Sequence, residues 1–147
     1  MRKVKKRKHI LVADRESGFR FAVTVALRKG GFQVTDTGDG GEVIDTIHRA
    51  KEVGNPVDLV MADIRLPGFP CLKMLPAHEE KGSPVPVFFV TGLDDLGLLS
   101  GIRSRCSIAF DHIEKPFAPV ELVERIDRIL GHHEAAAAAG CQETPPG

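Results

Sequence analysis

A short apolar run that ends in a carboxylate constrains this chain more than any other feature. Residues 57–63 read Val-Asp-Leu-Val-Met-Ala-Asp, and a Pro-Gly turn follows at residues 67–68. A run of this length between turn residues is typical of a strand buried on both faces of a parallel sheet. Ligands bind open α/β sheets at the carboxyl edge of the strands, where Asp63 would lie. A carboxylate is costly to bury there without a partner, so we expect Asp63 to serve a site.

Five strand-like segments alternate with helix-like segments along the chain. The expected strands are residues 9–14, 32–37, 57–63, 85–91 and 107–113. Alternating βα units with short connections predict a parallel sheet covered on both faces. Five such units predict a flavodoxin-like (βα)5 fold of class α/β, a doubly wound five-stranded parallel sheet with strand order 2-1-3-4-5.

Helical periodicity and breakers place five helices between these strands. The first begins near Ser17 and ends at Gly30-Gly31, and the second ends at Gly54. A short third helix is expected within residues 70–76. Asp94 or Asp95 is expected to cap the fourth, and the fifth is expected to run from Pro119 to Gly131. The predicted apolar side of the fourth helix consists of Leu96, Leu98, Leu99 and Ile102.

The chain of 147 residues is long enough for one domain, which we expect at residues 9–131. Residues 1–8 form a basic arm, interpreted as a solvated terminus more readily than as a nucleic-acid contact. Residues 132–147 form a low-complexity tail, in which the alanines could extend the last helix a little and the rest is expected to be disordered. No second domain fits in this length, which favours a stand-alone domain unless the chain is a fragment of a longer regulator.

Composition excludes several classes of function. The formal net charge is zero, and Trp and Tyr are absent, which makes nucleic-acid binding an unfavourable interpretation. Three cysteines without a short-spaced pair favour free thiols in a reducing cytoplasm over a zinc site or a disulfide framework. No apolar stretch reaches the length of a membrane span. We therefore expect a cytoplasmic protein that does not contact a membrane.

Four expected strand ends carry polar groups toward one edge of the sheet: Asp14, Asp63, Thr91 and Lys115. The segments that contain them read Ile-Leu-Val-Ala-Asp-Arg-Glu (10–16), Asp-Leu-Val-Met-Ala-Asp-Ile-Arg-Leu-Pro-Gly (58–68), Val-Phe-Phe-Val-Thr-Gly (87–92) and Glu-Lys-Pro-Phe (114–117). In this order, over residues 9–131, the chain resembles the response-regulator receiver domain of two-component signalling.

The resemblance implies that Asp63 accepts a phosphoryl group from the phosphohistidine of a histidine kinase or phosphotransfer protein. It implies a Mg²⁺ ion held by Asp14, Asp63 and the backbone carbonyl of Arg65, because the charge on the phosphoryl oxygens must be neutralised. Lys115 would supply a fixed positive charge and Thr91 a hydroxyl donor. The family pattern also implies a cis peptide bond between Lys115 and Pro116. Arg65 lies where family members tune the lifetime of the phosphoryl group.

The resemblance further implies a switch that acts by conformational change, in a domain that is not an enzyme in the usual sense. Thr91 would move toward the phosphate, and the residue three before the lysine, here His112, would turn inward. Because imidazole titrates near neutrality, a pH-responsive switch is a hypothesis for this chain. The family signals to a downstream protein target through the face formed by its fourth helix, fifth strand and fifth helix, and its members often form homodimers through this face.

Two departures from the family pattern bear on the function. Arg15 stands where the family has a second metal-binding acid, which opposes a divalent cation unless Glu16 substitutes or Arg15 itself clamps phosphate. The turn at residues 69–71 also differs, which predicts a rearranged third helix. The alternative is therefore a pseudo-receiver, a protein-docking module that is never phosphorylated. A flavin-phosphate binder is a weaker alternative, because the loops lack a Ser/Thr/Gly-rich phosphate cradle.

Overall fold

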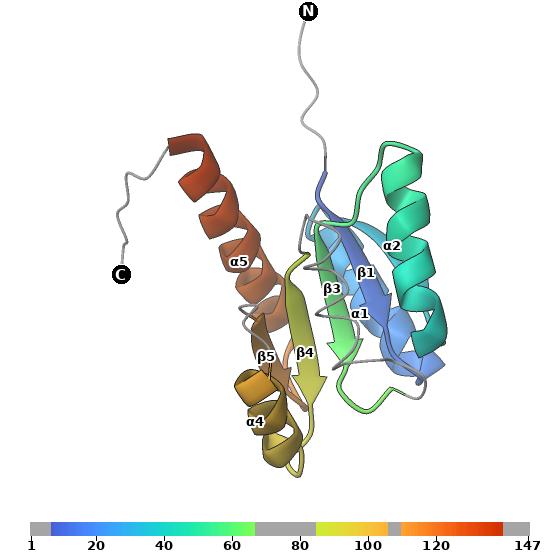
Figure 1. Ribbon diagram of the computed structural model, residues 1–147, viewed down its shortest axis with the longest axis vertical. Helices are drawn as coiled ribbons and strands as arrows, with labels where there is room; N and C mark the ends of the chain where they lie inside the picture. The colour runs from blue at the N-terminus through green and yellow to red at the C-terminus, as the bar shows by residue number, and fades with distance from the viewer. Residues whose placement is uncertain (1–6, 67–84, 106–109, 140–147) are drawn as a thin grey trace, which may run out of the picture.

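Five parallel strands form the centre of the protein, whose computed structural model describes residues 7–66, 85–105 and 110–139. The strands are β1 (His9–Ala13), β2 (Gln33–Thr37), β3 (Leu59–Asp63), β4 (Val87–Thr91) and β5 (Phe110–Glu114). They are ordered β2-β1-β3-β4-β5, and each neighbouring pair is parallel (Figure 1). The predicted class, strand direction and strand order are therefore confirmed.

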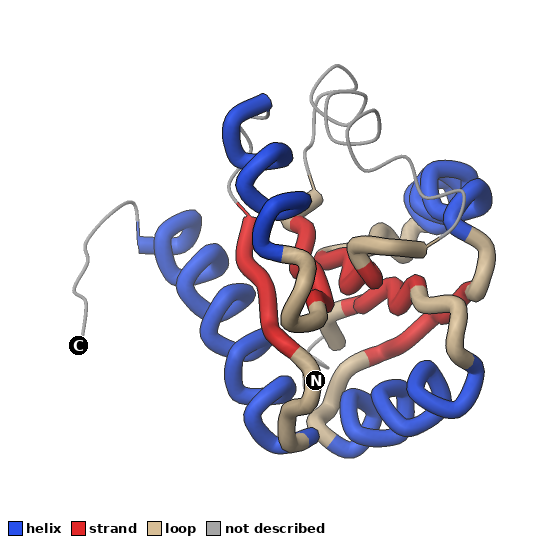
Figure 2. Tube along the Cα trace, turned by 90° about the horizontal axis from the view of Figure 1, so that it is seen from below, coloured by secondary structure: helices blue, strands red, loops and turns tan. Residues whose placement is uncertain are grey.

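Helices cover both faces of this sheet, as Figure 2 shows from below. They are α1 (Ser17–Lys29), α2 (Val43–Glu52), α4 (Leu96–Arg105) and α5 (Pro119–Ala139), and a 3-10 turn, η1 (Gly40–Glu42), precedes α2. The apolar sides of α1 and α5 pack on one face of the sheet, and those of α2 and α4 pack on the other. This is the doubly wound arrangement that the alternating pattern predicted.

Alternation along the strands divides the core into two layers. In β1, Ile10 and Val12 pack with α1 and α5, whereas Leu11 and Ala13 pack with α2 and α4. All five residues of β1 and of β4 are buried, as a strand covered on both faces requires. β2 lies at one edge and buries Val34 alone among its five residues. The central strands are therefore rigidly held, which fixes the positions of their carboxyl ends.

Turn chemistry places the ends of α1 and α2 where the sequence predicted them. Gly30 is the C-cap of α1, and Gly31 follows with φ of 96°, a conformation that glycine adopts without strain. Gly54 has φ of 80° after α2. Predictions for residues 1–6, 67–84, 106–109 and 140–147, which include the third helix and the start of the fifth strand, lie outside the described residues.

Two helix predictions were wrong. α5 does not end at Gly131 but continues to Ala139. The alanine run that follows the glycine favours the helix, because alanine is the best helix former, and a single glycine does not terminate it. In α4, Leu99 is 3% exposed, but Leu96 and Leu98 are 63% and 46% exposed. Successive residues turn by about 100° around a helix axis. The predicted leucines point in several directions around the helix, and α4, which covers one edge of the sheet, buries Leu99 but leaves Leu96 and Leu98 exposed.

Candidate phosphorylation site

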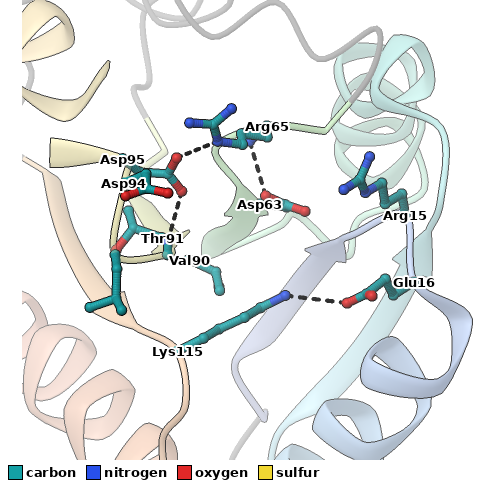
Figure 3. Close-up of a pocket in the computed structure, with 11 residues that line it drawn as sticks. Arg15, Glu16, Asp63, Arg65, Val90, Thr91, Asp94, Asp95 and Lys115 are labelled. Carbon is teal, nitrogen blue, oxygen red and sulfur yellow. Dashed lines mark hydrogen bonds and ion pairs between the residues drawn. The ribbon is translucent and has the colours of Figure 1, made fainter. Parts of the chain in front are cut away.

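The carboxyl ends of β1, β3, β4 and β5 surround an open pocket of about 310 Å³ (Figure 3). The residues that line it are Arg15, Glu16, Asp63, Arg65, Val90, Thr91, Gly92, Leu93, Asp94, Asp95 and Lys115. Three of the four polar strand ends predicted from the sequence thus border one cavity. The fourth, Asp14, is buried beside it and lies within ion-pair distance of Lys115.

Asp63 ends β3 and lies in the middle of the pocket (Figure 3). Its Oδ1 accepts a hydrogen bond from the backbone N–H of Arg65 at 2.9 Å. Its backbone carbonyl accepts the N–H of Leu66 at 3.0 Å, which closes the turn that follows the strand. The other carboxylate oxygen accepts no hydrogen bond from any described residue. One oxygen of Asp63 is therefore held in place, and the second is left for chemistry in the pocket.

Asp14 is a buried carboxylate with one unsatisfied oxygen. The residue is 1% exposed; its Oδ1 accepts the Glu16 N–H at 2.8 Å, whereas Oδ2 has no hydrogen-bond partner among the described residues. Burial raises the pKa of Asp14 above its ordinary value, and this effect outweighs the opposing hydrogen bond from Glu16 and the charge of Lys115. The charge of Asp63 adds to the rise. An additional cation at Oδ2 would relieve this energetic penalty.

Lys115 brings the positive charge to this edge of the sheet. Its Nζ lies 3.8 Å from Asp14 Oδ2 and 3.5 Å from Glu16 Oε1. It also lies 4.0 Å from the ring centroid of Phe19, and that ring contacts Phe117 edge to face at 5.8 Å. Aromatic faces attract a cation, so Phe19 helps to hold the lysine. The predicted cis peptide bond between Lys115 and Pro116 is confirmed.

The donor set fits a small hard cation. Asp14 offers an unpartnered oxygen and Asp63 a free one, and Mg²⁺ is commonly bound through one or two carboxylates with water in its remaining positions. Glu16, the predicted substitute ligand, instead pairs with Lys115. Within residues 7–66, 85–105 and 110–139, no group of three or more His, Cys, Asp or Glu side chains could hold a metal. A metal here would therefore depend on two carboxylates.

The two predicted switch residues both lie in the described structure. Thr91 is 2% exposed, and its hydroxyl donates to the backbone carbonyl of Ile113 at 3.4 Å. His112 is half-buried in β5, and its Nδ1 has no partner among the described residues. Arg125 of α5 donates to the His112 carbonyl at 2.6 Å, which ties β5 to α5. In this state the Thr91 hydroxyl is engaged with β5.

Two arginines line the pocket with different partners. Arg15 is exposed and makes no hydrogen bond or ion pair with any described residue; Figure 3 shows it across Asp63 from Asp95. Arg65 donates from Nε to Asp95 Oδ1. Asp95 precedes α4 as predicted, but its side chain does not cap the helix: Oδ2 accepts the Gly92 N–H at 2.7 Å. The sequence analysis missed the pairing of Asp95 with Arg65 and Gly92. Its position, four residues after Thr91 at the end of β4, was a usable signal that Asp95 lies near the site.

Comparison with known proteins identifies the kind of domain. The response regulator receiver domain family matches residues 10–127. The DNA-binding transcriptional regulator NtrC of Klebsiella pneumoniae is 28% identical over 123 residues, which are 84% of this chain and 25% of NtrC. The DNA-binding response regulator MtrA of Mycolicibacterium smegmatis is 32% identical over 129 residues, 87% of this chain and 53% of MtrA. The chain thus spans between a quarter and about half of these relatives.

A solved structure supports the fold. The CheY-like receiver domain protein of Methanospirillum hungatei has a TM-score of 0.69 and 24% identity, over 88% of this chain and 98% of that one. Among the helices that the structure describes, none combines the length and the apolar character that a membrane crossing requires.

Proposed function

Because the chain belongs to the response regulator receiver domain family of two-component systems, we propose that Asp63 is its phosphoacceptor. The donor is the phosphohistidine of a histidine kinase or of a phosphotransfer protein. The free oxygen of Asp63 attacks phosphorus, the O–P bond forms as the P–N bond breaks, and the imidazole leaves. The observation that carries the proposal is the Asp63 carboxylate itself, with one oxygen fixed by the Arg65 N–H and one open in a pocket that Lys115 borders.

The residues around Asp63 have separable roles in this reaction. Lys115 contributes positive charge toward a phosphoryl oxygen, and its contacts with Glu16 and Phe19 orient it beforehand. Asp14 and Asp63, with the backbone carbonyl of Arg65, would hold Mg²⁺. The ion, when bound, neutralises charge on the transferring group. Thr91 supplies a hydroxyl once it leaves the Ile113 carbonyl.

Intact mass after incubation with acetyl phosphate tests this proposal, with Asp63→Asn as the matched variant. A phosphate adduct that requires both Mg²⁺ and Asp63 supports it. An adduct that forms without Mg²⁺ would assign the cation's role to Arg15, which faces the pocket without a described partner. The asparagine variant removes the nucleophile but keeps the size and a side-chain oxygen for the Arg65 N–H, so it should retain the fold.

A pseudo-receiver remains the second candidate, and Arg15 is the observation that favours it. Its guanidinium lines the pocket at a position where the family has a metal-binding acid. Under this reading the domain docks a protein partner and is never phosphorylated. Absence of an adduct in the folded wild type, together with its restoration in Arg15→Asp, would establish that Arg15 is the cause.

We further propose that the signal leaves through the face of α4, β5 and α5. The support is exposed apolar surface: Leu93, Leu96, Leu98 and Val120 are 79%, 63%, 46% and 65% exposed. Leu96 and Leu98 belong to α4 and Val120 to the first turn of α5, two of the three elements of this face. Exposed apolar side chains are available for protein–protein contacts. Sedimentation with and without acetyl phosphate would reveal a homodimer through this face. Leu96→Ser should abolish it without changing the amount of phosphate adduct.

A further inference from the structure

Arg65 makes two contacts that point in different directions. Its backbone N–H donates to Asp63 Oδ1 at 2.9 Å, and its guanidinium donates from Nε to Asp95 Oδ1. The first contact is with the candidate phosphoacceptor, and the second is with the turn before α4 (Figure 3). One residue therefore joins the reactive carboxylate to the start of a helix thirty residues further along the chain.

Asp95 closes that turn. Its Oδ2 accepts the Gly92 N–H at 2.7 Å, and its own N–H donates to the Gly92 carbonyl at 3.2 Å. Its carbonyl accepts the N–H of Leu99 at 3.0 Å, the first bond of α4. The side chain is 6% exposed. Residues 92–95 and the first turn of α4 thus depend on where the Asp95 carboxylate lies.

The Arg65 guanidinium compensates the charge of this buried carboxylate. Burial alone would raise the pKa of Asp95, but the hydrogen bonds from Gly92 and Arg65 and the charge of Arg65 together lower it below its ordinary value. Removing the guanidinium would leave this buried charge without its ion-pair partner, with the Gly92 N–H still bonded to Oδ2, and losing one partner of a buried pair is unfavourable. The Arg65 side chain is 54% exposed, so it has room to change partner.

A phosphoryl group on Asp63 would be a stronger partner for the guanidinium. It carries more negative charge than a carboxylate, and its oxygens match the planar fork of an arginine. Asp63 already acts electrostatically on Arg65 and adds to the rise in the arginine's pKa, an effect led by Asp95. The two acids therefore already attract the same side chain.

We propose that phosphoryl on Asp63 draws Arg65 away from Asp95, and that the unpaired Asp95 then loosens residues 92–95 and the first turn of α4. Asp95 is in this sense a positioning residue, which holds Arg65 away from Asp63 until the phosphoryl group arrives. The inference rests on the proposed phosphorylation of Asp63. It adds a second path to α4 beside that of Thr91, whose hydroxyl is engaged with Ile113.

Amide hydrogen exchange of the full chain, read by mass spectrometry over residues 92–99, tests this path. Samples with and without acetyl phosphate and Mg²⁺ are compared for wild type, Arg65→Met, Arg65→Lys and Arg28→Met. The control Arg28→Met removes the same charge from an arginine that bonds the Val34 carbonyl and does not line the pocket. Intact mass of the same samples reports the adduct, and exchange in β1 and β3 reports folding.

Phosphorylation of the wild type should raise exchange over residues 92–99 by about fivefold or more, the lower end of typical coupling between sites. Without phosphorylation, Arg65→Met should already show the raised exchange of the phosphorylated wild type, and its exchange should change little when acetyl phosphate and Mg²⁺ are added. Arg65→Lys, which can still pair with Asp95, should behave more like the wild type, and Arg28→Met should match it.

Two results overturn the inference alone, given a normal adduct. The first is that unphosphorylated Arg65→Met exchanges its amides over residues 92–99 as slowly as the unphosphorylated wild type. The second is that phosphorylation increases this exchange in Arg65→Met by as much as it does in the wild type. Absence of an adduct on the folded wild type is a different failure. It would overturn the proposed phosphorylation, and this inference with it.

Discussion

Replacing Asp14 by asparagine should stabilise this protein at neutral pH in metal-free buffer. Asp14 Oδ2 is buried without a hydrogen-bond partner among the described residues. An unsatisfied buried group costs about 1–3 kcal/mol when it is neutral and more when it is charged, and this excess for the charge is what asparagine removes. Asparagine keeps a side-chain oxygen for the Glu16 N–H and removes the charge. The lost attraction to Lys115, 3.8 Å away, is worth about 1 kcal/mol, because that lysine is 32% exposed and its interaction is largely screened.

The balance is a gain of about 1 kcal/mol in the free energy of unfolding, or a rise in Tm of about 3 °C for a domain of this size. Its pH dependence follows from the raised pKa of Asp14. The folded state binds the Asp14 proton more tightly than the unfolded state does. Protonation of Asp14 therefore contributes its full stability below the ordinary pKa of 3.8, and this stability is lost as pH rises through the raised pKa of the folded state. The advantage of asparagine should therefore be small near pH 4 and grow toward neutrality.

Urea unfolding of wild type and Asp14→Asn across this pH range, with a chelator present, measures the effect. Asp127→Asn, at an exposed position in α5, is the control for loss of one negative charge. A wild type more stable than Asp14→Asn at neutral pH, or a difference that does not vary with pH, would refute the reasoning. Mg²⁺ should stabilise the wild type and leave Asp14→Asn unchanged; equal stabilisation of both would place the metal elsewhere.

Three further predictions follow from single contacts. Lys115→Met should slow adduct formation from acetyl phosphate by about 100-fold, as loss of one charged contact to a transferring group does; an unchanged rate would exclude its catalytic role. Gly30→Ala should lower the free energy of unfolding by about 1–3 kcal/mol, because the new methyl would lie 2.9 Å from Val123 Cγ1, whereas Gly18→Ala, with nothing within 4 Å, should not destabilise α1. His112→Phe should remove any difference in phosphorylation-induced amide exchange between pH 6 and pH 8; parallel behaviour of both proteins would discard the pH hypothesis.

The strand order and the pocket could be predicted because their signals are local. Apolar runs bounded by turn residues define the strands, and parallel topology then brings Asp63, Thr91 and Lys115 to one edge whatever the side-chain details. The Lys115–Pro116 cis bond was accessible only through the family resemblance. The strand order, the position of the pocket and the cis bond are all properties of the backbone path.

Side-chain partners could not be predicted in this way. The Arg65–Asp95 pair joins residues 30 positions apart, and an acid before a helix is explained equally well as a cap. The Thr91 hydroxyl could bond in either direction, and it bonds to β5. The end of α5 was misplaced because Gly131 is a natural C-cap only where the chain turns, and here it does not.

The central claim is that phosphate resides on Asp63, and chemical trapping tests it most directly. Sodium borohydride reduces an acyl phosphate to an alcohol, which converts a phosphorylated aspartate into homoserine. Peptide mass spectrometry after acetyl phosphate, Mg²⁺ and borohydride should find homoserine at position 63 and leave Asp14, Asp94 and Asp95 unreduced. Homoserine at another position, or none in a folded protein, would contradict the account.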